Sequence, residues 1–304
     1  MKKYLIQLIL IGSTLFLLPF FIVYATGNLE AQLAYKQIEE QQNVKEEQVT
    51  NLIEVSRLIG ILAKEIPSNY EMETLKAQGV ICRTYLARRL LRIETKGQLV
   101  GYTEEEMRKL WGQDYDSIYA IYKEAVEATG NEVILYNDEP IEAVYHRASS
   151  GNTRNAEEVY GMVISYLQSV ENPKDVLTKQ IPIKKSEIVK RLKEKYPTIL
   201  LQEEKLEAQI QVIEKDQAEY VKSLQIGNQI IEGEELKNLL GLPSSCFKIF
   251  SEPDWLVFDV RGEGHGIGFS QNGANEWAKE GKDYKELIAS YYKDVKIEEY
   301  NYKR

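Results

Sequence analysis

The sequence predicts an α+β fold, because helical and strand-like segments are mixed without the regular strand–helix–strand order of a parallel sheet. Apolar residues recur every three or four positions over 52–65 and again over 72–93, which predicts two helices. Alternating residues over 133–146 flank the turn pair Asn137-Asp138, which predicts a β-hairpin. The 304 residues are 43% hydrophobic and 28% charged, a globular composition sufficient for one large domain or two small ones.

Capping residues indicate where the helices begin. Ser68 and Glu71 form a capping-box pair ahead of the second helix. Thr103 and Glu106 repeat the pattern before a short helix that ends near Trp111. The other expected elements are helices near 116–129, 187–196 and 234–240, strands near 208–213 and 219–226, and a last helix capped by Asp283 and Glu286.

The N-terminus carries a long uncharged run. Residues 4–24 are 21 residues without a charge, and a helix of that length, at about 1.5 Å per residue, spans a hydrocarbon core of roughly 30 Å. Two lysines precede the run and no positive cluster follows it, so the positive-inside rule places the N-terminus in the cytoplasm and the remainder outside. We expect a single membrane-spanning anchor; a signal peptide cleaved near Ala25 is the alternative.

The composition changes after this run. Residues 27–50 are rich in Glu, Gln and Lys and poor in large apolar residues, which is typical of a stalk. The helical pattern begins directly after them. We therefore divide the chain into an anchor over 1–26, a stalk over 27–50 and an extracytoplasmic domain over 51–304.

The net charge and the scarcity of cysteine and histidine exclude several classes of function. A formal net charge of -9 argues against nucleic-acid binding, which depends on neutralising phosphates. Only two cysteines are present, so a disulfide scaffold is excluded, although one long-range bridge stays open. Cys82 lies on an apolar helix seam and is expected to be a buried free thiol. Two histidines without HExxH or CxxC lead us to expect neither a metal nor a cofactor.

One basic cluster stands out within the second helix. It either lines an anionic groove or forms a solvated helix face. Its members are Arg83, Arg88, Arg89 and Arg92.

The most unusual local feature is a run of alternating glycines, Gly262, Gly264, Gly266 and Gly268, with His265 at its centre. The run lacks the third glycine of the dinucleotide-binding GxGxxG in every register, and no GK[ST] follows to make a P-loop. Glycines at alternate positions allow a positive φ or a close approach of the backbone to another group. We expect this run to form the wall of a site.

Acid–base chemistry by a carboxyl group remains, because Ser270 does not lie in a GxSxG elbow and is better interpreted as an N-cap. Glu65 ends the first apolar helix beside Pro67, where we expect the surroundings to favour the protonated acid that glycosidic-bond cleavage needs. The alternative from the residues alone is a surface glutamate at a helix end. Glu73 is the second candidate, and its alternative is a first-turn glutamate favoured by the helix dipole.

Three segments resemble the SpoIID/LytB family. Residues 65–85 contain EIP and ETLKAQGVICRTY, similar to EMP and EALKAQAVAARTY in the family. Residues 140–157 contain PIEAVYH, SSGNT and NAE, and residues 262–274 read GEGHGIGFSQNGA. The resemblance covers about residues 50–300, and its motifs stand in the family's order behind the expected anchor.

This resemblance implies a lytic transglycosylase. Such an enzyme cleaves the MurNAc–GlcNAc bond of peptidoglycan without water and leaves 1,6-anhydroMurNAc, with one glutamate acting first as acid and then as base. By position the resemblance carries this role to Glu65, with Glu73 in reserve. It implies groove-lining donors at Arg83, Tyr85, His146, Ser149, Ser150, His265, Ser270 and Gln271.

The resemblance also implies a cellular setting. Family members act on peptidoglycan glycan strands at the engulfing septum of sporulating bacteria, with the cell-wall amidase SpoIIP and the membrane protein SpoIIM. We expect the same partners here, no nucleic acid, and a single-pass protein of the cell membrane. LytB-type relatives are called amidase modifiers, so a non-catalytic glycan-binding stimulator of an amidase is the alternative. A septal tether that uses only the anchor and the stalk is a third interpretation.

The sequence departs from the family at three places. Glu263 stands where members often carry the tryptophan of GWGHG, so one stacking surface is lost. Residues 79–82 read GVIC in place of a run of small residues. Some members carry a Cys/His zinc cluster after this helix, and the sequence between Arg92 and Tyr136 has none, which is a second reason to expect no metal.

Overall fold

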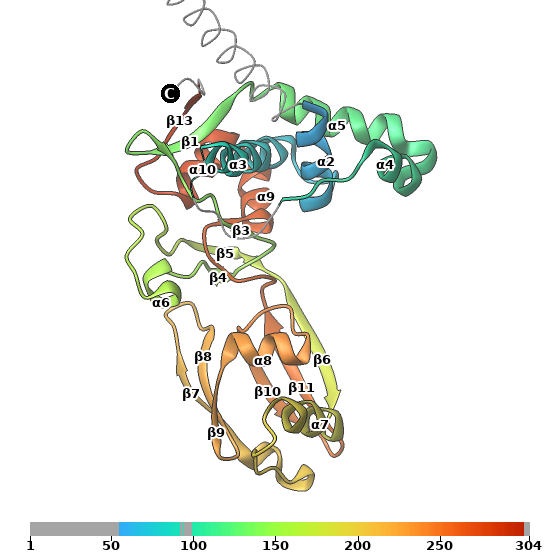
Figure 1. Ribbon diagram of the computed structural model, residues 1–304, viewed down its shortest axis with the longest axis vertical. Coiled ribbons are helices and arrows are strands. Elements are labelled where there is room, and N and C mark those ends of the chain that lie inside the picture. Colours follow the sequence, from blue (N-terminus) through green and yellow to red (C-terminus); the bar gives the residue numbers. More distant parts are fainter. Residues whose placement is uncertain (1–54, 92, 94–98, 301–304) are drawn as a thin grey trace, which may run out of the picture. The chain divides into compact units, whose positions relative to one another are not determined.

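Figure 1 shows the computed structural model, which describes residues 55–91, 93 and 99–300. The expected anchor over 1–26 and stalk over 27–50 lie outside this part of the chain. Among the described residues, no helix has both the length and the apolar character needed to cross a membrane. Helices and strands are mixed, as the sequence predicts for an α+β fold.

The first hydrophobic core surrounds a central helix, α3 (Met72–Leu90). It contacts α2 (Val55–Glu65), α5 (Tyr115–Glu127), α9 (Gln271–Lys279), α10 (Tyr284–Tyr291) and strand β1 (Glu132–Tyr136). Because neighbours cover it on all sides, every residue of α3 from 77 to 87 is buried. The helix therefore lacks the polar outer face of an ordinary surface helix.

The predicted capping boxes differ in outcome. Thr103 and Glu106 cap α4 (Glu104–Trp111) reciprocally, and Asp283 and Glu286 do the same for α10. The box expected from Ser68 and Glu71 does not form. Instead, the backbone N–H of Glu71 donates to Asn275 Oδ1 at 2.7 Å. The start of α3 packs against α9, so a backbone N–H there is satisfied by a side chain of α9. The start of α4 is exposed, and its free N–H groups are satisfied by side chains of the same segment.

The predicted hairpin is confirmed in its first half and wrong in its second. Strands β1 and β2 (Glu139–Pro140) pair across Asn137 and Asp138, which have φ of 52° and 63°. The second strand does not continue to His146. Residues 145–146 form β3 instead, which pairs in parallel with β12 (Phe269–Ser270), while β1 takes β13 (Lys296–Glu299) on its other edge. The alternating pattern over 141–146 indicated which side chains are buried in the core, but it did not indicate which strand these residues pair with.

The second hydrophobic core is built from two three-stranded antiparallel sheets and two helices. One sheet has the order β10-β11-β6 and the other β7-β8-β9. The elements are β6 (Thr178–Lys184), α7 (Lys185–Lys195), β7 (Ile210–Lys215), β8 (Val221–Ile226), β9 (Gln229–Glu232), α8 (Gly233–Leu240), β10 (Phe247–Ser251) and β11 (Trp255–Arg261). Their inward side chains are almost all Ile, Leu, Val and Phe. These side chains form a cluster that is separate from the core around α3.

Several short elements complete the described part of the fold. They are the 3-10 helices η1 (Gly112–Asp114), η2 (Glu203–Lys205) and η3 (Glu207–Gln209), the strands β4 (Ser150–Asn152) and β5 (Glu171–Val176), and the helix α6 (Ala156–Tyr160). Strands β4 and β5 pair with each other. The glycine segment, residues 262–268, runs from β11 of the second core to β12 of the first.

The glycine segment has the backbone that the sequence predicts. All four alternating glycines have positive φ, between 71° at Gly268 and 107° at Gly264. Space is also short: a Cβ added at Gly268 would lie 2.2 Å from the carbonyl oxygen of Val144, and one at Gly264 would lie 2.8 Å from His146 Cβ. Only glycine allows this backbone to lie directly on the segment around β3.

We predict opposite effects for two glycine-to-alanine changes. Gly268→Ala meets both a positive φ and a backbone oxygen, so it should lower the free energy of unfolding by about 1–3 kcal/mol or more. Gly79→Ala adds a methyl group in open space within α3 and should raise it by roughly 0.5–1 kcal/mol. Urea unfolding of the two purified variants measures both values. Equal effects would contradict the assignment of strain to the glycine segment.

Candidate active site

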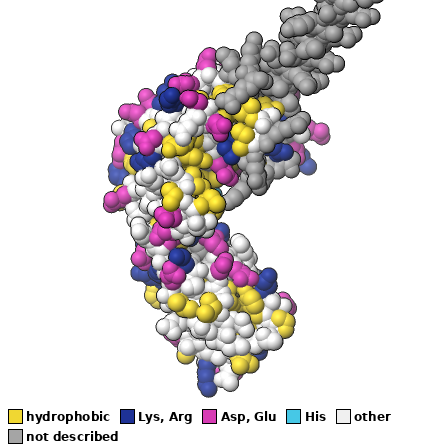
Figure 2. Space-filling model, turned by 60° about the vertical axis from the view of Figure 1, so that its left-hand side comes forward, with side chains coloured by type: hydrophobic (Ala, Val, Ile, Leu, Met, Phe, Trp, Pro, Cys, Tyr) yellow, Lys and Arg dark blue, Asp and Glu magenta, His cyan; other side chains and the backbone are white. Residues whose placement is uncertain are grey.

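An open cleft of about 650 Å³ lies where the glycine segment meets the end of α2. Its lining residues come from both cores: from the end of α2, from β3 and the start of α9, and from the start of β6 and the glycine segment. They are Glu65, Tyr145, His146, Arg147, Leu177, Lys179, Glu263 and Gln271. On the face drawn in Figure 2, acidic and basic side chains are intermixed and form no continuous basic stripe.

Glu65 is held in the cleft by two contacts. It is the last residue of α2, which ends just before Pro67. The hydroxyl of Tyr145 donates to Glu65 Oε2 at 2.6 Å, and the side-chain amide of Gln271 donates to the Glu65 backbone carbonyl at 2.9 Å. Burial raises the pKa of Tyr145 far above its usual value, so this hydroxyl keeps its proton at any physiological pH.

Glu73, the reserve candidate, does not line the cleft. One carboxyl oxygen pairs with Lys76 at 2.6 Å, and the other accepts the backbone N–H of Tyr284 at 2.9 Å. This second contact ties the first turn of α3 to the start of α10. Of the two glutamates proposed from the sequence, only Glu65 reaches the cleft.

The two histidines are neighbours, with ring centroids 5.6 Å apart. His146 Nδ1 lies 3.1 Å from the carbonyl oxygen of Ile267, which can only accept, so Nδ1 carries the proton and Nε2 is an acceptor. Burial and the neighbouring His265 lower the pKa of His146 to about 3. Burial and Lys237 lower the pKa of His265 to about 4. Both rings are neutral near pH 7, and His146 Nε2 is a buried acceptor without a partner among the described residues, in place of the expected donor.

Gln271 lines the cleft as expected, whereas Ser270 does not. The hydroxyl of Ser270 is fully buried and accepts from the backbone N–H of Gly273 at 3.3 Å. This makes Ser270 the N-cap of α9, which confirms the first interpretation of this residue. Its hydroxyl therefore stabilises the helix that carries Gln271.

The guanidinium of Arg83 is hydrogen-bonded to protein groups inside the first core. Its guanidinium donates to the carbonyl oxygens of Val126 and Glu132 at 3.2 and 3.0 Å, and to Thr129 Oγ1 at 3.1 Å. It closes the C-terminal end of α5 and is 2% exposed, so it is neither a groove donor nor part of a solvated face. Tyr85 is buried on the same helix and does not line the cleft.

Ser149 and Ser150 are buried and do not line the cleft. The backbone N–H of Ser149 donates to Asp175 Oδ2 at 3.0 Å, and the hydroxyl of Ser150 donates to the carbonyl oxygen of Ala218 at 2.8 Å. These contacts fix the loop that follows β3. The motif around them therefore holds the site's framework instead of facing a ligand.

Several cleft residues were missed by sequence reasoning. Lys179 Nζ pairs with Glu263 Oε2 at 2.8 Å, and the guanidinium of Arg147 lies 5.1 Å from the ring centre of Tyr70. Tyr145 and Arg147 are the sequence neighbours of His146, which belongs to the family motif PIEAVYH, so that motif could have pointed to both residues. Lys179 gave none, because β6 was not predicted. Among the described residues, no cluster of three His, Cys, Asp or Glu side chains could hold a metal ion.

Comparison with known proteins identifies the family. The sequence profile named SpoIID, stage II sporulation protein, matches residues 42–136. Stage II sporulation protein D of Bacillus subtilis (strain 168) is 31% identical over 254 residues, which cover 80% of this chain and 73% of that protein. The chain belongs to the SpoIID family. The protein of the same name from Bacillus amyloliquefaciens is 29% identical over 254 residues, with the same coverage.

This SpoIID-family chain is also similar, at lower identity, to the amidase enhancer of Bacillus subtilis (strain 168). It is 24% identical over 294 residues, which cover 80% of this chain and 40% of that protein.

The lowered pKa values of the two histidines predict an acid-sensitive SpoIID-family protein. In the unfolded chain a histidine titrates near 6.5, whereas in the folded chain His146 and His265 titrate at about 3 and 4. Below about pH 6.5 the unfolded state therefore binds more protons, and the free energy of unfolding falls as the pH drops towards 4. Urea unfolding at a series of pH values measures the slope, which should be shallower for His146→Gln. An unchanged slope would contradict a neutral, buried His146.

Proposed function

We propose that the protein is a peptidoglycan lytic transglycosylase, which cleaves MurNAc–GlcNAc bonds and leaves 1,6-anhydroMurNAc during wall remodelling at the sporulation septum. The observation that carries the proposal is the placement of Glu65. Its side chain lines an open cleft in a chain of the SpoIID family, with the carboxyl group oriented by Tyr145 and the backbone carbonyl held by Gln271. Family membership supports action on the cell wall, and the geometry supports the choice of residue.

In this mechanism one carboxyl group moves one proton twice. Protonated Glu65 donates its proton to the glycosidic oxygen, and the bond between that oxygen and C1 of MurNAc breaks. The 6-hydroxyl of the same sugar then attacks C1 and gives its proton to the Glu65 carboxylate, which restores the acid. The C1–O6 bond replaces the C1–O4 bond, so no water is consumed. This differs from ordinary glycosidases, which divide the work between two carboxyl groups.

The cleft supports this scheme in two further ways. Its other carboxylate, Glu263, pairs with Lys179, and the scheme with one carboxyl group does not require it as a second catalytic group. Apart from Leu177, its lining residues carry polar groups, and Arg147 and Lys179 supply N–H donors for sugar hydroxyls and carbonyls. Sugar strands are recognised by such arrays of donors and acceptors, and the openness of the cleft suits a long polymer.

We predict that Glu65→Gln abolishes formation of anhydro ends. Glutamine keeps the size and hydrogen bonding of the side chain but cannot carry the proton, so turnover should fall about 10²–10⁴-fold or more, with little change in glycan binding. Mass spectrometry of digested purified glycan strands measures the product. Glu73→Gln, outside the cleft, and Glu263→Gln, inside it, are the matched controls. If either control loses the product and Glu65→Gln keeps it, the wrong glutamate has been assigned.

The second candidate function is a glycan-binding stimulator of a cell-wall amidase without turnover of its own. The similarity to the amidase enhancer favours it. The partners proposed by resemblance are the amidase SpoIIP and the membrane protein SpoIIM. If the wild-type protein makes no anhydro ends on any glycan, alone or with the amidase, yet raises the amidase rate, the stimulator replaces the enzyme.

We also propose that the domain is held outside the cytoplasmic membrane by the uncharged run at residues 4–24. Protease added to intact protoplasts that produce the protein should then digest the domain. Immunoblotting with an antibody to the C-terminal region measures the loss, with a cytoplasmic protein as the protected control. Full protection of the domain would refute this topology.

A further inference from the structure

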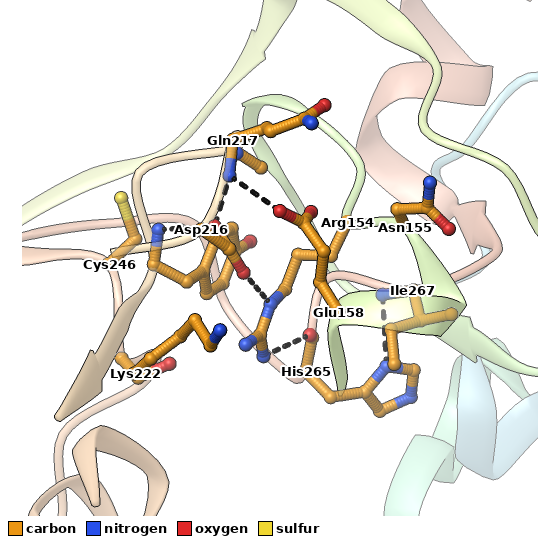
Figure 3. Close-up of polar contacts among 12 residues, drawn as sticks. Arg154, Asn155, Glu158, Asp216, Gln217, Lys222, Cys246, His265 and Ile267 are labelled. Carbon is orange, nitrogen blue, oxygen red and sulfur yellow. Dashed lines mark hydrogen bonds and ion pairs between the residues drawn. The ribbon is translucent and has the colours of Figure 1, made fainter. Parts of the chain in front are cut away.

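A largely buried ion cluster that the proposed chemistry does not use joins elements of the two hydrophobic cores, and Figure 3 shows its members Arg154 and Asp216. At its centre is Arg154, which is 3% exposed. Arg154 Nε donates to Asp216 Oδ2 at 2.6 Å, and Nη1 donates to Glu234 Oε1 at 2.8 Å. A buried arginine with two carboxylates is costly to desolvate, so its position calls for an explanation beyond stability.

The backbone around Arg154 belongs to the first core, whereas its side chain enters the second. The N–H of Ala156 donates to the carbonyl oxygen of Leu167, and both residues are buried in the core around α3. Asp216 lies in the turn between β7 and β8, and Glu234 lies in the first turn of α8. One side chain therefore links the two cores.

Arg154 also holds two successive carbonyl groups of the glycine segment. Its backbone N–H donates to the carbonyl oxygen of Gly266 at 2.7 Å, and Nη1 donates to that of His265 at 3.2 Å. The guanidinium lies 4.6 Å from the ring centre of Tyr220, which covers its face. A Cβ at Gly266 would lie 2.6 Å from Tyr220 Oη and 3.0 Å from Arg154 Cδ, so the segment is pressed against this pair.

The partners of Arg154 are themselves fixed. The second oxygen of Asp216 accepts the backbone N–H groups of Ala218 and Tyr220, at 3.1 and 2.9 Å. Burial alone would raise the pKa of Glu234, but the hydroxyl of Ser245 and the cations Lys237 and Arg154 lower it below its usual value. The guanidinium reaches two carboxylates and a carbonyl oxygen from two separate nitrogen atoms, a geometry that the single nitrogen of an ammonium cannot reproduce.

We propose that Arg154 is a positioning residue of the cleft. It holds the glycine segment, and with it Glu263 and His265, at a set place relative to Glu65 without touching the substrate. The glycine segment connects β11 to β12. Its position therefore sets the position of Glu263 relative to Glu65 across the cleft. The effect on glycan rests on the proposed function, whereas the effect on the segment does not.

Arg154→Lys in the full-length protein tests this proposal, because it keeps the charge and removes the fork. Amide hydrogen exchange should speed up by about 10-fold or more in residues 262–268, since local opening there becomes easier. KM for purified glycan strands should rise by about 10-fold, as expected when binding contacts are misplaced. Simple loss of folded protein would lower kcat alone and leave KM unchanged.

A matched control separates positioning from general effects of substitution. Arg191→Lys makes the same chemical change on α7, where the guanidinium contacts Glu187 and the carbonyl oxygen of Leu239 away from the cleft. This variant should keep wild-type exchange in 262–268 and wild-type KM.

The outcomes are distinct. If Arg154→Lys is less stable but keeps wild-type exchange in 262–268 and wild-type KM, the cluster only stabilises the fold and the proposal is overturned. If Arg154→Lys does not fold, Asp216→Asn, which leaves the other contacts of Arg154, should show the same changes to a smaller degree, and wild-type values there overturn it. If the wild-type protein neither cleaves nor binds glycan, the proposed function fails, and exchange in 262–268 alone decides the role of Arg154.

Discussion

The cleft depends on one close contact between two stretches of backbone. The glycine segment, residues 262–268, lies on the chain around β3, where a Cβ at Gly268 would stand 2.2 Å from the carbonyl oxygen of Val144. This contact, together with the paired hydrogen bonds between Ala148 and Glu263, brings Glu263 to the same cleft as Glu65. Glycine is required because the approach is too close for any side chain and because φ is positive at each alternate position. The positions of the cleft's polar side chains therefore depend on glycines, which have no side-chain groups of their own.

Much of the first core could be predicted from the sequence, because helices with apolar seams and capped, exposed ends are determined locally. The capping boxes of α4 and α10, the turn at Asn137-Asp138 and the positive φ of the glycines are of this kind. What failed was decided by distant partners. The start of α3 is satisfied by Asn275 and not by Ser68, and residues 145–146 pair with β12 in place of β1. A single sequence carries no signal for such long-range choices.

The candidate site was recovered in part for the same reason. Glu65, His146 and Gln271 line the cleft as the motifs suggest. Arg83 belongs to an equally recognisable motif, yet three oxygen acceptors from α5 and the chain after it bury its guanidinium. A motif shows that a residue is needed and does not show whether it faces a ligand or the protein. Lys179 is the converse case, since it lines the cleft from a strand that has no recognisable pattern.

In the proposed reaction, the contacts of the two cleft carboxyl groups favour Glu65 over Glu263 as the group that carries the proton. Glu263 is paired with the ammonium group of Lys179 at 2.8 Å. Glu65 faces the hydroxyl of Tyr145, a neutral partner that can donate to a carboxylate and can equally rotate to accept from a carboxylic acid. Its orientation can therefore persist through both halves of a cycle in which it gives up a proton and regains it. A single acid–base group needs this property, because the same atom must be in place for the second transfer after it has completed the first.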